Sequence, residues 1–272
     1  MFCDTALAAR IERAEAQLIT EWNAATRRRR GTLAGFAIPS AGGVASYAEP
    51  DSPINKVAGL GFAGLPDLDA IERAFADRSA PVNVEVASLA HPMLLELLAD
   101  RGYRLVSFEN VLGRALGDDV ERIALSGIEV HPSGDDEFGT WMDVVVDATL
   151  HPDTQGVPWH EEFPREILEN AEHDTVGLVQ RYLATVDGVP AGGGSLRITE
   201  GIAQLTGAAT APAFRRRGIQ SALLAARLAD ATAAGCEVAV ITVQPGSKSQ
   251  QNAQRRGFGL LYIRAVLTKS ST

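Results

Sequence analysis

The first thirty positions carry hydrophobic residues at the spacing of an amphipathic helix. Apolar side chains recur every three or four residues, at Leu7, Ile11, Ala14, Leu18 and Trp22. This period predicts a helix over residues 5–28. Four arginines, Arg27 to Arg30, close the segment. They indicate a solvated helix end, where cations meet the negative pole of the helix dipole, and a nucleic-acid patch is the alternative interpretation.

The rest of the first half alternates short apolar runs with polar, glycine-containing breaks. Such runs predict strands at residues 33–38, 43–47, 57–62, 82–86 and 104–112. Longer periodic segments predict helices at residues 67–77 and 91–101, the second closed by Gly102. The order is typical of an α/β domain.

A more polar stretch, residues 113–127, begins and ends in glycine and separates two regions of similar length. We place a boundary there and predict domains over residues 1–117 and 128–272. The second half predicts a strand at 128–130, helices at 135–149 and 163–173, and a hairpin of 181–186 with 191–198 around Asp187-Gly188. It continues with strand 202–210, helix 221–234, strand 237–243, helix 248–256 and strand 258–268. The run of a helix, Arg-Gly-Tyr or Arg-Gly-Phe and a long strand occurs twice, which indicates an internal duplication.

Composition narrows the functional class. A length of 272 residues, 46% hydrophobic, suits two ordinary domains of a soluble protein. The formal net charge of −9 disfavours a dominant nucleic-acid role. Cys3 and Cys236 lack metal or redox spacing, so we predict no metal site. The sequence contains no leader pattern and no run of 18 apolar residues, so we expect a cytoplasmic protein that does not bind membranes.

The segment Arg215 to Ser221, RRRGIQS, is the strongest candidate for chemistry. A helix beginning here would offer unpartnered backbone amides and the positive end of its dipole, a combination that binds phosphate. Gly218 lets the backbone approach a ligand oxygen without a Cβ in the way. The arginines add charge-assisted hydrogen bonds. The glycine loop lacks the lysine-serine pair of P-loop enzymes and the dinucleotide fingerprint.

The run TAPAFRRRGIQSALLAARL, a β-branched strand and SKSQQNAQRRGF together resemble the GCN5-related N-acetyltransferase (GNAT) superfamily. The family motif reads Gln/Arg-x-x-Gly-x-Gly/Ala. Arg215 and Gly218 match its first and central positions, whereas Gln220 replaces the final small residue. The resemblance implies two GNAT-like α/β (α+β) domains, each a mixed, mostly antiparallel twisted sheet flanked by helices. The first half lacks the loop, so we interpret it as a degenerate copy that has lost cofactor binding.

The resemblance also implies where coenzyme A binds. The strand before the loop would splay from its neighbour and pair with the pantetheine arm, and the loop would hold the pyrophosphate. The helix at 248–256 would lie against the cofactor. The implied cofactor-binding residues are Ala208, Ala209, Thr210, Arg215, Arg216, Arg217, Gly218, Ile219, Gln220, Ser221, Ser249 and Asn252.

The catalytic residues are less evident. The family's commonest arrangement places a proton-donating tyrosine four residues before Gly-Phe, but this chain has Ala253 there. Tyr262 is a candidate substitute, and a core or rim position is its alternative role. Water or direct thiolate release stays open. The candidate bases are Glu161, Glu162, His160 and Glu200, none of which is singled out by its spacing, and a solvated loop position is the alternative role. Trp159 and Phe163 are candidate pocket residues, with packing under the loop as the alternative.

We therefore expect an acetyl-CoA-dependent N-acetyltransferase that acts on a primary amine, in a small molecule or a protein. The missing tyrosine keeps a non-catalytic acyl-CoA binding or sensing module as the alternative. A monomer containing two similar domains and a homodimer are both compatible with the sequence.

Overall fold

The structure is a computed structural model that describes residues 1–31, 35–117, 126–153, 157 and 161–270. It forms two compact units. The first unit comprises Phe2–Val111 and Leu261–Thr272, and the second comprises Leu112–Leu260 with Met1. The predicted domains, 1–117 and 128–272, assign the last strand to the second half. The structure instead groups most of that strand with the first unit. None of the helices among the described residues has the length and apolarity needed to cross a membrane.

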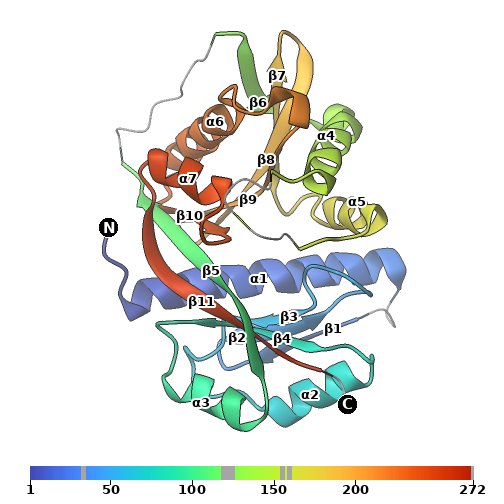
Figure 1. Cartoon of the computed structure of the whole chain (residues 1–272), viewed down its shortest axis with the longest axis vertical. Helices are drawn as coiled ribbons and strands as arrows, with labels where there is room; N and C mark the ends of the chain where they lie inside the picture. The colour runs from blue at the N-terminus through green and yellow to red at the C-terminus, as the bar shows by residue number, and fades with distance from the viewer. Residues whose placement is uncertain (32–34, 118–125, 154–156, 158–160, 271–272) are drawn as a thin grey trace. The chain divides into compact units, whose positions relative to one another are not determined.

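The first unit is a mixed sheet between helices (Figure 1). Its strands run in the order β1 (Phe36–Ser40), β2 (Gly43–Tyr47), β3 (Lys56–Ala58), β4 (Val82–Ala87), β11 (Gly259–Lys269) and β5 (Arg104–Ala115). β3 and β4 are parallel, whereas β11 pairs antiparallel with β4. The helices are α1 (Thr5–Arg30), α2 (Leu68–Ala76) and α3 (Met93–Asp100).

Helix α1 has the amphipathic face that its sequence predicts. The Asp4 side chain caps its start by accepting a hydrogen bond from the Leu7 amide at 2.8 Å. Ile19 packs on one face of the strands with Val44 and Ala58, while α2 and α3 cover the other face. At its end, Arg29 and Arg30 both pair with the carboxylate of Glu49. The predicted strand 57–62 ends at Ala58, because Gly59 and Gly61 turn the chain with φ values of 75° and 85°.

A cluster of buried charges lies under α1 in the first unit. Arg264 is 1% exposed, and its Nε donates to Glu12 Oε1 at 2.8 Å. Its Nη1 lies 3.5 Å from Glu85 Oε2 and 3.6 Å from Glu109 Oε2. Lys56 Nζ donates to Glu85 Oε1 at 2.8 Å. The three carboxylates therefore share two cations, and burial together with the Glu85 charge raises the pKa of Glu109 to about 7.

The second unit is a mostly antiparallel sheet with helices on both faces (Figure 1). Its strands run in the order β5, β10 (Val238–Val243), β9 (Ile202–Thr210), β8 (Val189–Thr199), β7 (Gln180–Val186) and β6 (Ile128–Pro132). β9 and β10 pair in parallel, whereas the pairs β6–β7, β7–β8 and β8–β9 are antiparallel. The helices are α4 (Phe138–Leu150), α5 (Arg165–Asp174), α6 (Ile219–Ala233) and α7 (Lys248–Arg255). The predicted fold class, mixed α/β with a mostly antiparallel sheet, is confirmed.

The two faces of the second sheet follow from the alternation of side chains along β7 and β8. Leu183 packs with Trp141 of α4, whereas Tyr182 and Ala184 join the core that α6 covers. On β8, glycines admit large neighbours on opposite faces. A Cβ on Gly193 would lie 2.6 Å from Trp141 Nε1, and a Cβ on Gly194 would lie 3.0 Å from Arg227 Cζ. The Gly-Gly-Gly run thus lets α4 and α6 approach the same strand from either side.

Candidate functional site

Strands β9 and β10 separate along their length. Their parallel register joins Ile202 to Val238 and ends at the pair Gln204 and Val240. Beyond this point, residues 208–210 of β9 and 241–243 of β10 line a cavity of about 740 Å³. The ends of both strands therefore line this cavity.

Helix α6 begins at the mouth of this cavity. Gly218 is the N-cap with φ 92°, and no side chain among the described residues caps the helix. Arg216, just before it, also adopts a positive φ of 63°. The first amides of α6 consequently lack a side-chain acceptor, and Gly218, Ile219, Gln220 and Ser221 all line the cavity. A helix start of this kind binds anions.

Cations surround the cavity although the chain as a whole is acidic. Basic side chains in the lining outnumber acidic ones, with Arg215, Arg216, Arg227, Lys248 and Arg255 against Asp153 and Glu161. The formal net charge of the chain is −9. The positive potential is thus local to this site, which favours an anionic ligand over nucleic acid in general.

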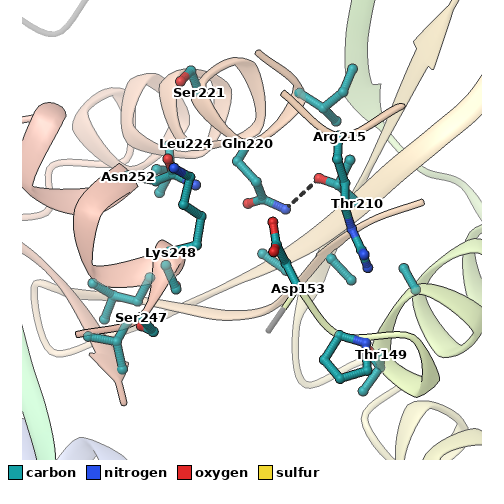
Figure 2. A pocket seen from close by; sticks show the side chains of 18 of the residues that line it. Thr149, Asp153, Thr210, Arg215, Gln220, Ser221, Leu224, Ser247, Lys248 and Asn252 are labelled. Atoms are coloured by element: carbon teal, nitrogen blue, oxygen red, sulfur yellow. Dashed lines mark hydrogen bonds between the residues drawn. The ribbon is translucent and has the colours of Figure 1, made fainter. Parts of the chain in front are cut away.

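Gln220 occupies the place where the family motif has a small residue. Its side chain lines the cavity, and its Nε2 donates to Thr210 Oγ1 at 2.9 Å (Figure 2). The larger side chain is thereby directed toward β9. The bond also joins the end of β9 to the start of α6.

Helix α7 forms the opposite wall. Ser247 caps its start by accepting from the Gln250 amide at 3.2 Å, and Lys248 and Asn252 line the cavity with Ser249 (Figure 2). Figure 2 places Asn252 and Lys248 on the side of the cavity away from Arg215. The cavity therefore has basic or polar groups on two walls and the splayed strands as its floor.

The comparison with protein families agrees with this geometry. Residues 145–259 match the model of the acetyltransferase (GNAT) family. These residues form a GNAT acetyltransferase domain. The match begins within α4 and ends at the first residue of β11, so the GNAT segment contains the splayed strands, the start of α6 and α7. The family fold supports acyl transfer from an acyl-CoA, and the resemblance predicted from the sequence is confirmed.

Solved GNAT structures share the fold over most of the chain. A GCN5-related N-acetyltransferase from Kribbella flavida has 19% identity and a TM-score of 0.63, covering 91% of this chain and 95% of its own. A tandem GNAT protein from the clavulanic acid biosynthesis pathway has 12% identity and a TM-score of 0.59, covering 94% and 95%. A Sphaerobacter thermophilus relative has 18% identity and a TM-score of 0.59, covering 75% and 66%. No curated protein matches the sequence.

Most of the predicted GNAT site residues gather in the cavity. Of the predicted set, the lining contains Ala208, Ala209, Thr210, Arg215, Arg216, Gly218, Ile219, Gln220, Ser221, Ser249, Asn252 and Glu161. Arg217 is absent from the lining, and its guanidinium lies 5.4 Å from the centre of the Phe214 ring. Among the described residues, no group of His, Cys, Asp and Glu is arranged to hold a metal ion.

Tyr262, the candidate proton donor, does not line the cavity. It belongs to the first unit, is 3% exposed, and donates its hydroxyl hydrogen to Glu12 Oε1 at 2.7 Å. Burial and the Glu12 charge raise its pKa well above the ordinary value. A buried phenol with a fixed acceptor is a poor proton donor to a substrate. We therefore give Tyr262 a structural role in the charge cluster.

The candidate bases also separate in the structure. Glu161 is exposed and lines the cavity, whereas Glu162 is exposed without lining it. Glu200 lies in the turn between β8 and β9, at the opposite end of β9 from Thr210. Trp159 and His160 lie outside the described residues.

Two groups near the cavity have no signal in the sequence. Arg227, about two turns into α6, is fully buried, and its Nη1 donates to the carbonyls of Ser195 at 3.1 Å and Thr206 at 3.3 Å. Burial lowers its pKa to about 10. Glu172, near the end of α5, faces β9. Both belong to helices whose periodicity is readable, but contact with β8 and β9 is a tertiary property.

Proposed function

We propose that this protein is an N-acetyltransferase that transfers the acetyl group of acetyl-CoA to a primary amine. The observation that carries the proposal is the uncapped start of α6 beside the splayed end of β9. Amides at 218–221, together with Arg215 and Arg216, would receive the pyrophosphate of the cofactor. Backbone groups of residues 208–210 would receive the pantetheine arm.

The chemistry requires a neutral amine that attacks the thioester carbonyl, donors for the oxyanion, and a route for two protons. Backbone amides at the end of β9 are suited to the oxyanion. Ala253, at the family's usual tyrosine position, is fully buried and offers no proton. The coenzyme thiolate, with a thiol pKa near 8.5, leaves tolerably without a donor.

The second candidate is a non-catalytic acyl-CoA binding or sensing module. The alanine at position 253 and the structural role of Tyr262 favour it. Release of free thiol from acetyl-CoA with a panel of primary amines separates the two, because only an enzyme turns over.

The remaining features of the proposal concern context. We propose a small-molecule amine or a protein amino group as the acceptor, and a cytoplasmic location. The first unit would be a degenerate GNAT copy, since its order β3, α2, β4, α3, β5 parallels β9, α6, β10, α7, β11. A monomer that acts as a pseudo-dimer and a homodimer both suit such a chain.

Binding of acetyl-CoA tests the proposal directly. Acetyl-CoA at about 100 times its dissociation constant should stabilise the wild-type protein by about 2.7 kcal/mol in thermal unfolding. Arg216→Glu places a carboxylate in the cavity lining and should weaken binding at least about tenfold, because a charge-assisted hydrogen bond is worth about 1.5–3 kcal/mol.

Arg217→Glu is the matched control. It makes the same charge change one residue further along, at a side chain outside the cavity lining. At about 0.15 M salt, where screening shortens the range of surface charges, it should change affinity less than about threefold. Equal losses in the two variants, or no binding by the wild type, would refute the proposed site.

A further inference from the structure

The backbone carbonyl of Glu172 is hydrogen-bonded, and its side chain faces strand β9. The carbonyl oxygen of Glu172 accepts from Arg181 Nη2 at 2.7 Å and from Thr175 Oγ1 at 3.1 Å. The Arg181 guanidinium is itself fixed, because it lies 4.6 Å from the Phe138 ring centre and 5.2 Å from that of Trp141. The last turn of α5 is thereby anchored to β7 and α4.

The Glu172 carboxylate borders a small opening on β9. A Cβ on Gly207 would lie 3.7 Å from Ser195 Oγ and 4.0 Å from Glu172 Oε1, and apart from the adjoining residues no other described heavy atom would lie within 4 Å. Gly207 has φ 53° and lies where the register of β8 and β9 shifts. The bulge therefore leaves room for about one methyl-sized group between two side-chain oxygens.

This opening adjoins the proposed acyl site from the opposite face. The next residue, Ala208, lines the cavity. Helices α4 and α5 cover one face of the sheet and α6 covers the other (Figure 1). A cofactor bound at the start of α6 and an amine admitted beside Glu172 would thus meet at the end of β9, which is the geometry that a transfer reaction requires.

The surroundings of Glu172 suit a proton acceptor near neutral pH. Burial raises its pKa to about 7, and the Arg181 charge and the Thr175 hydroxyl limit the rise. The other titratable groups nearby are Asp135, which acts on Arg181, and the neighbouring His173 and Asp174 on α5. Among the described residues, none of these groups forms a short ion pair with the Glu172 carboxylate. The carboxylate is accordingly available to accept a proton from the acceptor amine.

We propose that the acceptor amine binds in the opening beside Gly207 and that Glu172 is the catalytic base. The inference rests on the proposed acyltransferase function. The amine nitrogen forms a bond to the thioester carbonyl carbon, and the carbon–sulfur bond breaks with its electron pair passing to sulfur. The Glu172 carboxylate takes the proton that the nitrogen loses. The thiolate is protonated from solvent, and Glu172 returns its proton to solvent.

The test compares pH–rate profiles of wild type, Glu172→Gln and Glu172→Asp, with acetyl-CoA and the primary amine that the wild type acetylates fastest. In the wild type, kcat/KM should rise with pH through about 7, because only the ionised carboxylate accepts a proton. Glu172→Gln should lower kcat/KM about 10²–10⁴-fold and abolish its rise near pH 7. Glu172→Asp should retain part of the rate and part of the rise with pH. Ionisation of the amine itself is common to all three proteins and cancels in the comparison.

Glu169→Gln is the control, since it removes the same charge one turn earlier on α5, where Glu169 is 39% exposed and pairs with Arg165. It should keep the wild-type rate and profile. Acetyl-CoA affinity should stay unchanged in every variant.

Each outcome has a defined meaning. If Glu172→Gln keeps the rise of kcat/KM near pH 7 and a rate within about fivefold of wild type, Glu172 is not the base, but the acetyltransferase function stands. If the wild type binds acetyl-CoA but acetylates no amine, both the transferase activity and the role of Glu172 as base are refuted. The protein would then be the non-catalytic acyl-CoA binding module. A wild type that does not bind acetyl-CoA overturns the proposed function itself.

Discussion

Replacing Arg264 with methionine is expected to destabilise the first unit by about 3–5 kcal/mol, because it removes one cation from a buried set of carboxylates. Glu12 is 1% exposed, and among the described residues only the Tyr262 hydroxyl would still donate to its Oε1. Glu85 would keep Lys56 at 2.8 Å, and Glu109 would lose its contact with Arg264. Urea denaturation at pH 8, followed by circular dichroism, measures the loss.

The loss of stability in Arg264→Met should depend on pH, because it arises from ionised carboxylates that have lost a cation. The Arg264 charge lowers the pKa values of Glu85 and Glu109, so both values rise in the variant and its folded state takes up protons more readily. Stability of the variant is then lost as pH rises through those values and recovered toward pH 5. The difference from wild type should therefore shrink on acidification.

Tyr262→Phe is the matched control for the charge cluster. It removes one hydrogen bond and keeps the Arg264–Glu12 pair, so a loss of about 1 kcal/mol is expected. Acetylation per folded molecule should be unchanged, because Tyr262 has a structural role here. An Arg264→Met loss below about 1 kcal/mol, or one that does not vary with pH, would contradict the account of the cluster.

The second large effect is expected at Gly193 on β8. A Cβ there would lie 2.6 Å from both Trp141 Nε1 and Val145 Cγ2, inside the contact distance of packed atoms. Trp141 cannot retreat easily, since it is fully buried and its Nε1 donates to the Tyr182 carbonyl at 3.0 Å. Gly193→Ala should therefore cost about 2–3 kcal/mol in thermal or urea unfolding by overpacking.

Gly139→Ala, on the helix α4 that packs against Gly193, is expected to have the opposite effect. Gly139 lies in α4, is exposed, and a Cβ there would meet nothing within 4 Å. The substitution should stabilise the protein by up to about 1 kcal/mol through reduced freedom of the unfolded chain. Similar destabilisation by the two alanines would mean that the α4–β8 contact does not limit the space at Gly193.

Local sequence was sufficient wherever the signal is carried by neighbouring residues. The period of α1, the run of strands and helices in the second half, and the glycine-capped start of α6 all depend on backbone geometry and hydrophobic alternation over a few turns. The loop around Gly218 follows because glycine accepts φ 92° and lets a helix begin without a side-chain cap. Gln220 was the exception, since its partner Thr210 lies ten residues away.

The placement of Tyr262 and Glu172 required the tertiary structure. Tyr262 follows the GNAT segment directly in sequence, yet it bonds to Glu12, 250 residues away. Glu172 sits on a helix rich in charged residues, where no spacing distinguishes it from Glu166 or Glu169. Its position beside Gly207 arises from a bulge between β8 and β9 and from packing of α5.

The amino-acid sequence by itself determined most helices and strands, the family of the second half and the glycine turn before α6, because each depends on contiguous residues. The tertiary structure alone decided that the last strand groups mainly with the first unit, which carboxylates are buried together, and which one faces β9. Those features depend on contacts between residues far apart in the chain. Such contacts follow from packing and desolvation, and neither has a local pattern.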